Sequence, residues 1–145
     1  MGNMSLKSSQ PIVLIEDDTD DQDMFRELII GLGIPNPLIF FDNAPDAFEF
    51  LIGNGQPFLI FCDVNLPMQT GLEFKKMVDD HPELRKKSIP FVFCTTSVDS
   101  GAISRAYLDM TVQGYFKKGS SMAEMEHTLK VIFEYWMLSV HPNSV

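Results

Sequence analysis

The feature that most constrains the fold of this chain is a set of five short runs built almost entirely from apolar residues. The runs are continuous rather than alternating, which is typical of strands buried on both faces of a parallel sheet. They are rich in Ile, Val and Phe, as such strands are. The five runs are Ile12–Ile15, Leu38–Phe41, Phe58–Cys62, Phe91–Cys94 and Gly114–Phe116.

Segments with a single apolar face separate these runs and predict helices. Two of them open with the spacing of a capping box, at Thr70 with Glu73 and at Ser121 with Glu124. Strand and helix alternate five times, which predicts an α/β fold: a doubly wound (βα)5 sandwich around a central five-stranded parallel sheet. The expected helices cover residues 24–32, 43–53 with Asn43 as N-cap and Gly53 as stop, 70–78, 98–110 and 121–136.

Polar residues follow the predicted strands where functional groups of such sheets collect, past the carboxyl ends. Carboxylates crowded there would repel one another, and a bound divalent cation would relieve that repulsion. Oxygen ligands without nearby His or Cys favour Mg²⁺. A carboxylate beside a metal, a hydroxyl and an ammonium is a suitable phosphoryl acceptor. The residues are Glu16 and Asp17 after the first strand, Asp63 after the third, Thr95 after the fourth and Lys118 after the fifth, with the main-chain carbonyl of Asn65 as a further metal ligand.

The order of these motifs resembles the response-regulator receiver family, with its CheY-like (flavodoxin-like) fold, from about Pro11 to Met137. The resemblance rests on Ile15–Asp18, on Asp63–Gly71 with Pro67 and Gly71 at the expected offsets, on Pro90–Thr95 and on Gly114–Lys118.

This resemblance implies a role for each site residue. Asp63 is the phosphoacceptor, and Asp17 binds Mg²⁺ directly while Glu16 does so through water. Asn65 contributes its carbonyl. Thr95 hydrogen-bonds the phosphoryl oxygens, Lys118 pairs with the phosphate, and Tyr115 rotates inward as Thr95 moves.

Three positions depart from the family pattern. Gly119 follows Lys118 where proline, often after a cis peptide, is usual, so a looser turn is expected there. Thr70 replaces a common acidic residue before Gly71. Glu16 replaces the commoner aspartate, a variation that keeps metal binding. The acids from Asp18 to Asp23 are interpreted as structural, with Thr19 or Asp20 as helix cap.

Composition limits the partners and the location. The formal net charge is −9, from 20 acidic and 11 basic residues, which argues against binding to nucleic acid. No apolar run approaches the about 20 residues that span a bilayer, so a cytoplasmic protein is expected. Cys62 and Cys94 are interpreted as buried reduced thiols, with a disulfide or regulatory pair as the alternative. His81, His127 and His141 lack ligand spacing.

The sequence therefore predicts a receiver over residues 11–140, with tails at 1–10 and 141–145. We expect a sensor histidine kinase or a histidine phosphotransfer protein to phosphorylate Asp63, with no enzymatic activity beyond the receiver's own phosphorylation and dephosphorylation. The output is contact with a downstream protein, or a homodimer, through the helix of residues 98–110, the strand of 114–116 and the helix that opens at Ser121. Leu84–Pro90 resembles stand-alone receivers that work with phytochrome-type and other hybrid sensor kinases. The alternatives are a phosphorylation-independent pseudo-receiver and a Mg²⁺-dependent phosphohydrolase.

Overall fold

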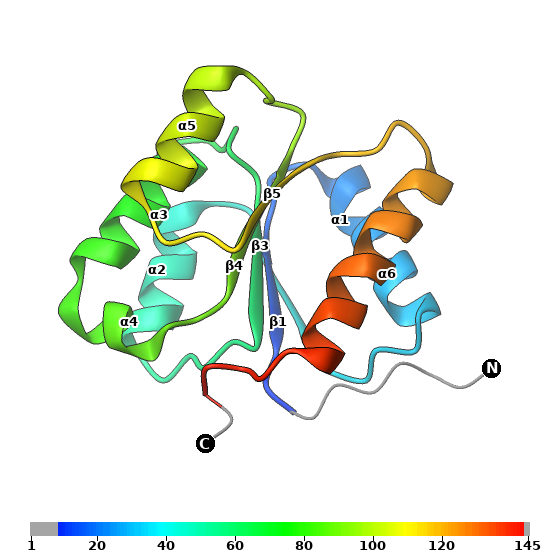
Figure 1. The fold of residues 1–145 in the computed structure, drawn as a ribbon, viewed down its shortest axis with the longest axis horizontal. Helices are drawn as coiled ribbons and strands as arrows, with labels where there is room; N and C mark the ends of the chain where they lie inside the picture. The colour runs from blue at the N-terminus through cyan, green and yellow to red at the C-terminus, as the bar shows by residue number, and fades with distance from the viewer. Residues whose placement is uncertain (1–8, 144–145) are drawn as a thin grey trace.

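The computed structural model of the chain describes residues 9–143 and contains a single five-stranded parallel sheet in that region, with strand order β2-β1-β3-β4-β5. This confirms the predicted doubly wound α/β sandwich (Figure 1). The strands are β1 (Ile12–Ile15), β2 (Leu38–Phe41), β3 (Leu59–Cys62), β4 (Phe91–Thr95) and β5 (Gly114–Lys117). The helices are α1 (Thr19–Gly31), α2 (Ala44–Ile52), α3 (Gly71–Asp80), α4 (Pro82–Lys87), α5 (Ser100–Asp109) and α6 (Met122–Leu138).

Helices cover both faces of the sheet, as Figure 1 shows. Helices α1 and α6 lie on one face, and α2, α3, α4 and α5 lie on the other. Each face has its own apolar core, because successive strand residues point to opposite sides. In β1, Val13 and Ile15 belong to the core under α2, α3, α4 and α5, whereas Ile12 and Leu14 belong to the core under α1 and α6. Burial on both faces explains why β1, β3 and β4 are continuous apolar runs, whereas the edge strands β2 and β5 are only partly buried.

The helix caps agree with the sequence at some ends and differ at others. Asn43 caps α2, and Thr70 and Glu73 form the predicted capping box of α3. The second predicted box is only half formed: Ser121 caps α6, but the Glu124 carboxylate accepts from Ser120 instead. The cap of α1 is Asp18, whose side chain accepts from the backbone N–H of Asp21, so the assignment to Thr19 or Asp20 was wrong.

One helix was not predicted from the sequence, the six-residue α4. His81 Nδ1 accepts from the backbone N–H of Leu84 at 3.3 Å. Pro82 stands at the first helical position, where a backbone N–H would have no partner within the helix, so its absence costs no hydrogen bond. A helix of this length is too short to show an apolar period. The next helix, α5, begins at Ser100 rather than Val98, because Asp99 caps it through the backbone N–H of Ala102.

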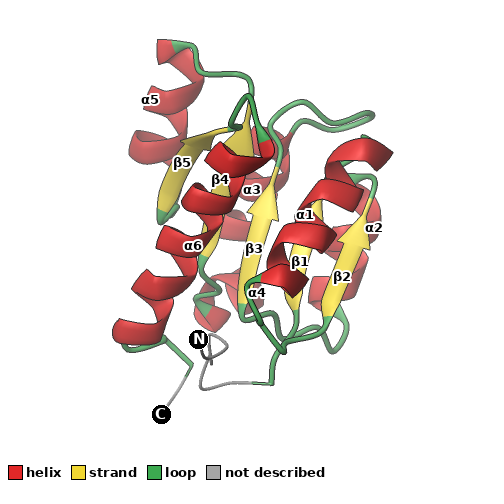
Figure 2. Cartoon of the chain, turned by 90° about the vertical axis from the view of Figure 1, so that its right-hand side faces the viewer, coloured by secondary structure: helices red, strands yellow, loops and turns green. Residues whose placement is uncertain are grey.

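All five strands point the same way, so their carboxyl ends meet at one edge of the sheet (Figure 2). Both ends of the described chain lie toward the opposite, amino edge. The expected tails lie mostly outside the described residues, but His141 is buried, and its Nε2 lies 2.8 Å from the carbonyl oxygen of Phe58. The position of the boundary at residue 140 stays a prediction.

The two cysteines are free and buried. Burial raises the pKa of the Cys62 thiol well above its usual value and that of Cys94 to about 12. Both thiols are therefore protonated at neutral pH. The two free, buried side chains agree with the interpretation as reduced core thiols and not with the alternative of a disulfide between them. Within residues 9–143, no helix is long and apolar enough to cross a membrane.

Candidate functional site

Three carboxylates meet at the carboxyl edge of the sheet. The pairing of β1 with β3 sets Ile15 opposite Cys62, so the residues that follow these strands are neighbours. One carboxylate oxygen from each of Glu16, Asp17 and Asp63 lies within 4.8 Å of the others. Glu16 and Asp63 are buried, whereas Asp17 is exposed. These are the three side chains that the sequence predicted as ligands of a divalent cation, and their arrangement is consistent with such a site.

Lys118 completes the cluster from the end of β5. Its Nζ lies 2.6 Å from Glu16 Oε1, 2.8 Å from Asp21 Oδ2 and 2.9 Å from Asp63 Oδ2. The backbone holds the residue in place, because the N–H of Lys118 donates to the carbonyl of Thr95 at 2.9 Å. Burial alone would lower the pKa of Lys118, but hydrogen bonds to Asp21, Glu16 and Asp63 outweigh burial and raise it. Lys118 is therefore a permanent cation directed at Asp63.

Asp21 is the site residue that sequence reasoning missed, since it was interpreted as one of several first-turn acids. Asp18 caps α1, so the helix begins just after Glu16 and Asp17, and Asp21 in its first turn faces Lys118. One signal in the sequence could have identified Asp21: it lies in the first turn of a helix that begins directly after two predicted site residues, Glu16 and Asp17.

The charges of the cluster fit a hard divalent cation. Three carboxylates contact the single ammonium group of Lys118, and a fourth, that of Asp17, lies beside two of them. Burial raises the pKa of Glu16 to about 7 in spite of the hydrogen bond and charge of Lys118, and the charge of Asp63 adds to the rise. An all-oxygen donor set with excess negative charge matches what Mg²⁺ or Mn²⁺ binds. Glu16, Asp17 and Asp63 are the side chains that could hold such an ion, with the Asn65 carbonyl as the fourth predicted ligand.

The loop after Asp63 is fixed by short backbone contacts. The N–H of Asn65 donates to Asp63 Oδ1 at 3.1 Å, and the N–H of Gly71 donates to the carbonyl of Val64 at 2.9 Å. A Cβ on Gly71 would overlap the Asp63 carbonyl oxygen and lie 3.0 Å from Val64 Cα. Only glycine therefore lets α3 begin this close to the backbone of Asp63.

Ser97 connects the predicted switch residues. Thr95 is fully buried, and its Oγ1 accepts from the N–H of Ser97 at 3.2 Å. Asn65 Nδ2 donates to Ser97 Oγ at 2.6 Å, and the Tyr115 hydroxyl donates to the Ser97 carbonyl. One residue thus contacts Thr95, Tyr115 and the loop that follows Asp63. The inward rotation of Tyr115 stays a prediction.

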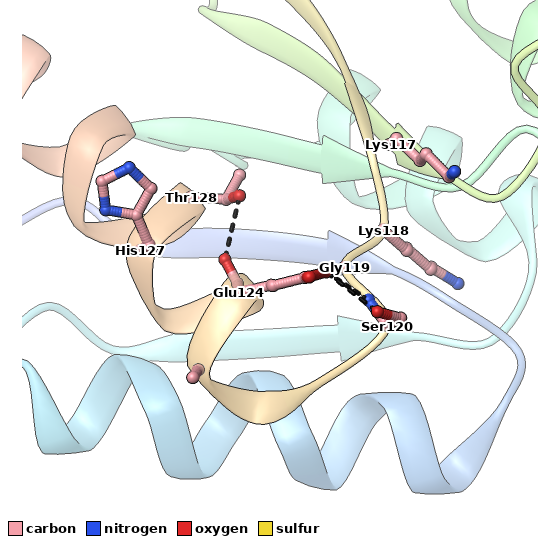
Figure 3. Close-up of a pocket in the computed structure, with 8 residues that line it drawn as sticks. Lys117, Lys118, Gly119, Ser120, Glu124, His127 and Thr128 are labelled. Atoms are coloured by element: carbon pink, nitrogen blue, oxygen red, sulfur yellow. Dashed lines mark hydrogen bonds between the residues drawn. The ribbon is translucent and has the colours of Figure 1, made fainter.

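The turn after Lys118 is held by α6 rather than loose (Figure 3). Glu124 Oε1 accepts from the N–H of Ser120 at 2.9 Å and from its hydroxyl at 3.0 Å. The N–H of Gly119 donates to Met125 Sδ, a bond that proline could not make, and a Cβ on Gly119 would lie 2.7 Å from Glu124 Cβ. Residues 9–143 contain no cis peptide. The expected looseness at Gly119 was wrong, and Figure 3 shows Lys118 pointing away from these bonds, toward the strand ends.

The sequence model of the response regulator receiver domain matches residues 12–130, and the chain belongs to this family of two-component signalling proteins. Among solved structures it is similar to the phosphorylated cyanobacterial phytochrome response regulator RcpA, with 25% identity and a TM-score of 0.83 over 94% of this chain and 100% of that one.

Two further structures share the fold at similar identity. The Mn²⁺-bound form of response regulator Rcp1 is 27% identical, with a TM-score of 0.78 over 90% of this chain and 96% of that one. A receiver domain from Rhodospirillum rubrum is 26% identical, with a TM-score of 0.79 over 91% and 96% of the two chains. No curated protein sequence matches this chain.

Proposed function

We propose that this chain is a phosphorylation-dependent receiver that takes a phosphoryl group on Asp63 from a sensor histidine kinase or a histidine phosphotransfer protein. The observation that carries the proposal is the ion pair between Lys118 Nζ and Asp63 Oδ2, at 2.9 Å, inside a cluster of metal-ligating carboxylates. RcpA is described in a phosphorylated form and Rcp1 with Mn²⁺, and both support the same chemistry for this chain.

The reaction uses side chains that already face one another. A carboxylate oxygen of Asp63 attacks the phosphorus of a phosphohistidine, the P–N bond breaks, and the imidazole leaves with the bonding electrons. Lys118 stabilises the charge on the phosphoryl oxygens from one side. Mg²⁺ held by Glu16, Asp17, Asp63 and the Asn65 carbonyl would neutralise these oxygens from the other. No substrate-derived atom stays on the protein except the phosphoryl group.

The acyl phosphate then changes the balance between two conformations. It carries about −1.5 to −2 charge where the free Asp63 carboxylate carried one negative charge, and it brings new acceptor oxygens beside Thr95 and Lys118. A change from 1:99 to 99:1 in favour of the active conformation needs about 5.5 kcal/mol of differential interaction. Inward movement of Thr95 and Tyr115 would alter the Ser97 contacts described above, and this links the site to β5.

We propose that the output leaves through the face formed by α5, β5 and α6. Apolar side chains there are exposed, among them Tyr107, Leu108, Val131, Tyr135 and Leu138. A downstream protein, or a second copy of the chain, would cover them. The expected cytoplasmic location and the absence of nucleic-acid binding remain predictions of the sequence.

Two alternatives predict different behaviour. A pseudo-receiver would bind its partner without being phosphorylated. The ion pair of Asp63 with Lys118 supports phosphorylation instead, because docking alone needs no buried cation beside Asp63. A phosphohydrolase with an aspartyl nucleophile usually has a second Asp two residues on. Asn65 occupies that place, and its amide is bonded to Ser97.

Intact-mass measurement with Mg²⁺ and a small phosphodonor separates these readings. The proposal predicts one hydroxylamine-labile phosphate on the wild-type protein and none on Asp63→Asn. Asp20→Asn is the matched control, because Asp20 is an exposed acid of α1 outside the cluster. No adduct with any donor, from a histidine phosphotransfer protein to small molecules, would favour the docking module. Rapid multiple turnover of donor would favour the hydrolase.

A further inference from the structure

A second polar cavity lies far from the phosphoacceptor site, at the amino edge of the sheet. Its volume is about 180 Å³, and it is enclosed by α3, α4 and the start of β4, with Pro142 at one side. Phe91, the first residue of β4, forms part of its wall. The residue after Pro142 is anchored to the end of α4, because Asn143 Nδ2 donates to the carbonyl of Lys87 at 2.8 Å.

The cavity contains a buried ion pair that phosphorylation chemistry does not use. Lys75 Nζ lies 2.8 Å from Asp79 Oδ1, and the two side chains are 4% and 7% exposed. The ammonium also donates to Thr111 Oγ1 at 3.1 Å and lies 5.0 Å from the centre of the Phe91 ring. An ammonium group has three N–H donors, so one of them can serve an acceptor in the cavity.

Positive charge exceeds negative charge in this cavity. Arg85 also lines it and makes no ion pair with any residue in the range 9–143. Burial lowers the pKa of Lys75, and the charge of Arg85 lowers it further, while Asp79 opposes both. Two cations therefore face a single carboxylate, in a protein whose net charge is −9. Such a site favours an anion that can pair with Arg85.

The remaining walls and the size define the rest of the ligand. Leu84, Ile89 and Phe91 supply buried apolar surface. The volume equals that of about six water molecules at roughly 30 Å³ each, which matches a ligand of about six non-hydrogen atoms.

We propose that this cavity binds a small aliphatic carboxylate, with its charged end between Lys75 and Arg85 and its carbon chain against Leu84, Ile89 and Phe91. The site is independent of phosphate transfer to Asp63. It adjoins Thr111, whose backbone N–H donates to Asp79 Oδ2 at 2.8 Å, so an occupant would contact the loop that leads into β5.

The competing interpretation is purely structural: the Lys75–Asp79 pair ties α3 to the loop at Thr111, and the cavity holds only water. Substitution of Lys75 does not separate the two, because it leaves Asp79 buried without its partner and destabilises the fold. Arg85 is exposed, so Arg85→Gln keeps the fold and removes one cation. Lys86→Gln is the matched control, since Lys86 is a neighbouring cation of α4 whose side chain is 76% exposed and outside the cavity lining.

The test is a titration of the full chain with butyrate in the absence of Mg²⁺ and phosphodonor. Backbone amide NMR spectra are recorded at each butyrate concentration. We expect saturable chemical-shift changes at the residues that line the cavity. Arg85→Gln should weaken the affinity for butyrate about tenfold, because it removes one charge-assisted contact, and Lys86→Gln should leave the affinity unchanged. Butylammonium, with the same chain and the opposite charge, should give no such shifts. Absence of shifts, shifts confined to other regions, or equal weakening by both variants would overturn the proposal and leave the structural ion pair.

Discussion

Replacement of Gly71 by alanine tests how closely α3 must approach the backbone of Asp63. The new Cβ would overlap the carbonyl oxygen of Asp63 and lie 3.0 Å from both the Asp63 carbonyl carbon and Val64 Cα. All three atoms are backbone, so no side-chain rotation can relieve the contact. The start of α3 and the loop from Asp63 must therefore move apart.

The magnitude follows from two opposing effects. Alanine reduces the freedom of the unfolded chain, which stabilises by about 0.4–1 kcal/mol where the backbone is compatible. Insertion of a methyl group into a filled space costs typically about 1–3 kcal/mol and more where the backbone must shift. Because the backbone must shift here, we expect a net loss of about 2 kcal/mol or more, which corresponds to a fall in Tm of at least roughly 4–8 °C for a domain of this size.

Gly31→Ala is the matched control. Gly31 also lies in a helix, and an added Cβ there meets no atom within 4 Å. It should leave the protein equally stable or more stable by about 0.5 kcal/mol. Urea unfolding and the rate of phosphorylation by a small donor are the measurements. If Gly71→Ala were as stable and as rapidly phosphorylated as Gly31→Ala, the close approach of α3 to Asp63 would have no effect on stability or phosphorylation, contrary to this prediction.

Three further predictions concern metal, pH and capping. Mg²⁺ at 100 times its Kd should raise the free energy of unfolding by about 2.7 kcal/mol, and thermal denaturation would measure this. Asp20→Asn should keep this stabilisation, whereas Asp17→Asn, which removes a predicted metal ligand, should lose it. Burial would raise the pKa of Asp79, but hydrogen bonds from Lys75 and Thr111 hold it below its ordinary value of 3.8. The stability it contributes is therefore present above that value and lost as pH falls through the lower folded pKa, so urea unfolding should show the gap between wild type and Asp79→Asn closing below about pH 4. Thr70→Ala should cost about 1 kcal/mol in the same assay, because it removes the cap of α3, and an unchanged midpoint would contradict that.

Sequence reasoning went furthest where the residue types of a short segment determined its structure. The continuous apolar runs predicted the buried parallel strands, and the rule that strand ends share an edge placed Glu16, Asp17, Asp63 and Lys118 together. These inferences needed only backbone geometry, which the residue types already specify.

Details that depend on three-dimensional packing could not be predicted in the same way. Asp21 reads as an ordinary first-turn acid until the Asp18 cap turns it toward Lys118. Gly119 reads as a loose turn until Glu124 is seen to hold Ser120. In each case the position of the residue depends on a long-range or loop contact, and a local sequence pattern does not predict such a contact.

The central claim is that Asp63, and no other residue, receives the phosphoryl group. Reduction of the phosphorylated protein with borohydride converts an aspartyl phosphate to homoserine, and peptide mass spectrometry then locates it. We expect homoserine at position 63 after incubation with Mg²⁺ and a phosphodonor, and none without the donor. Homoserine at another aspartate, such as Asp17 or Asp21, or phosphate on a residue that borohydride does not reduce, would contradict the account.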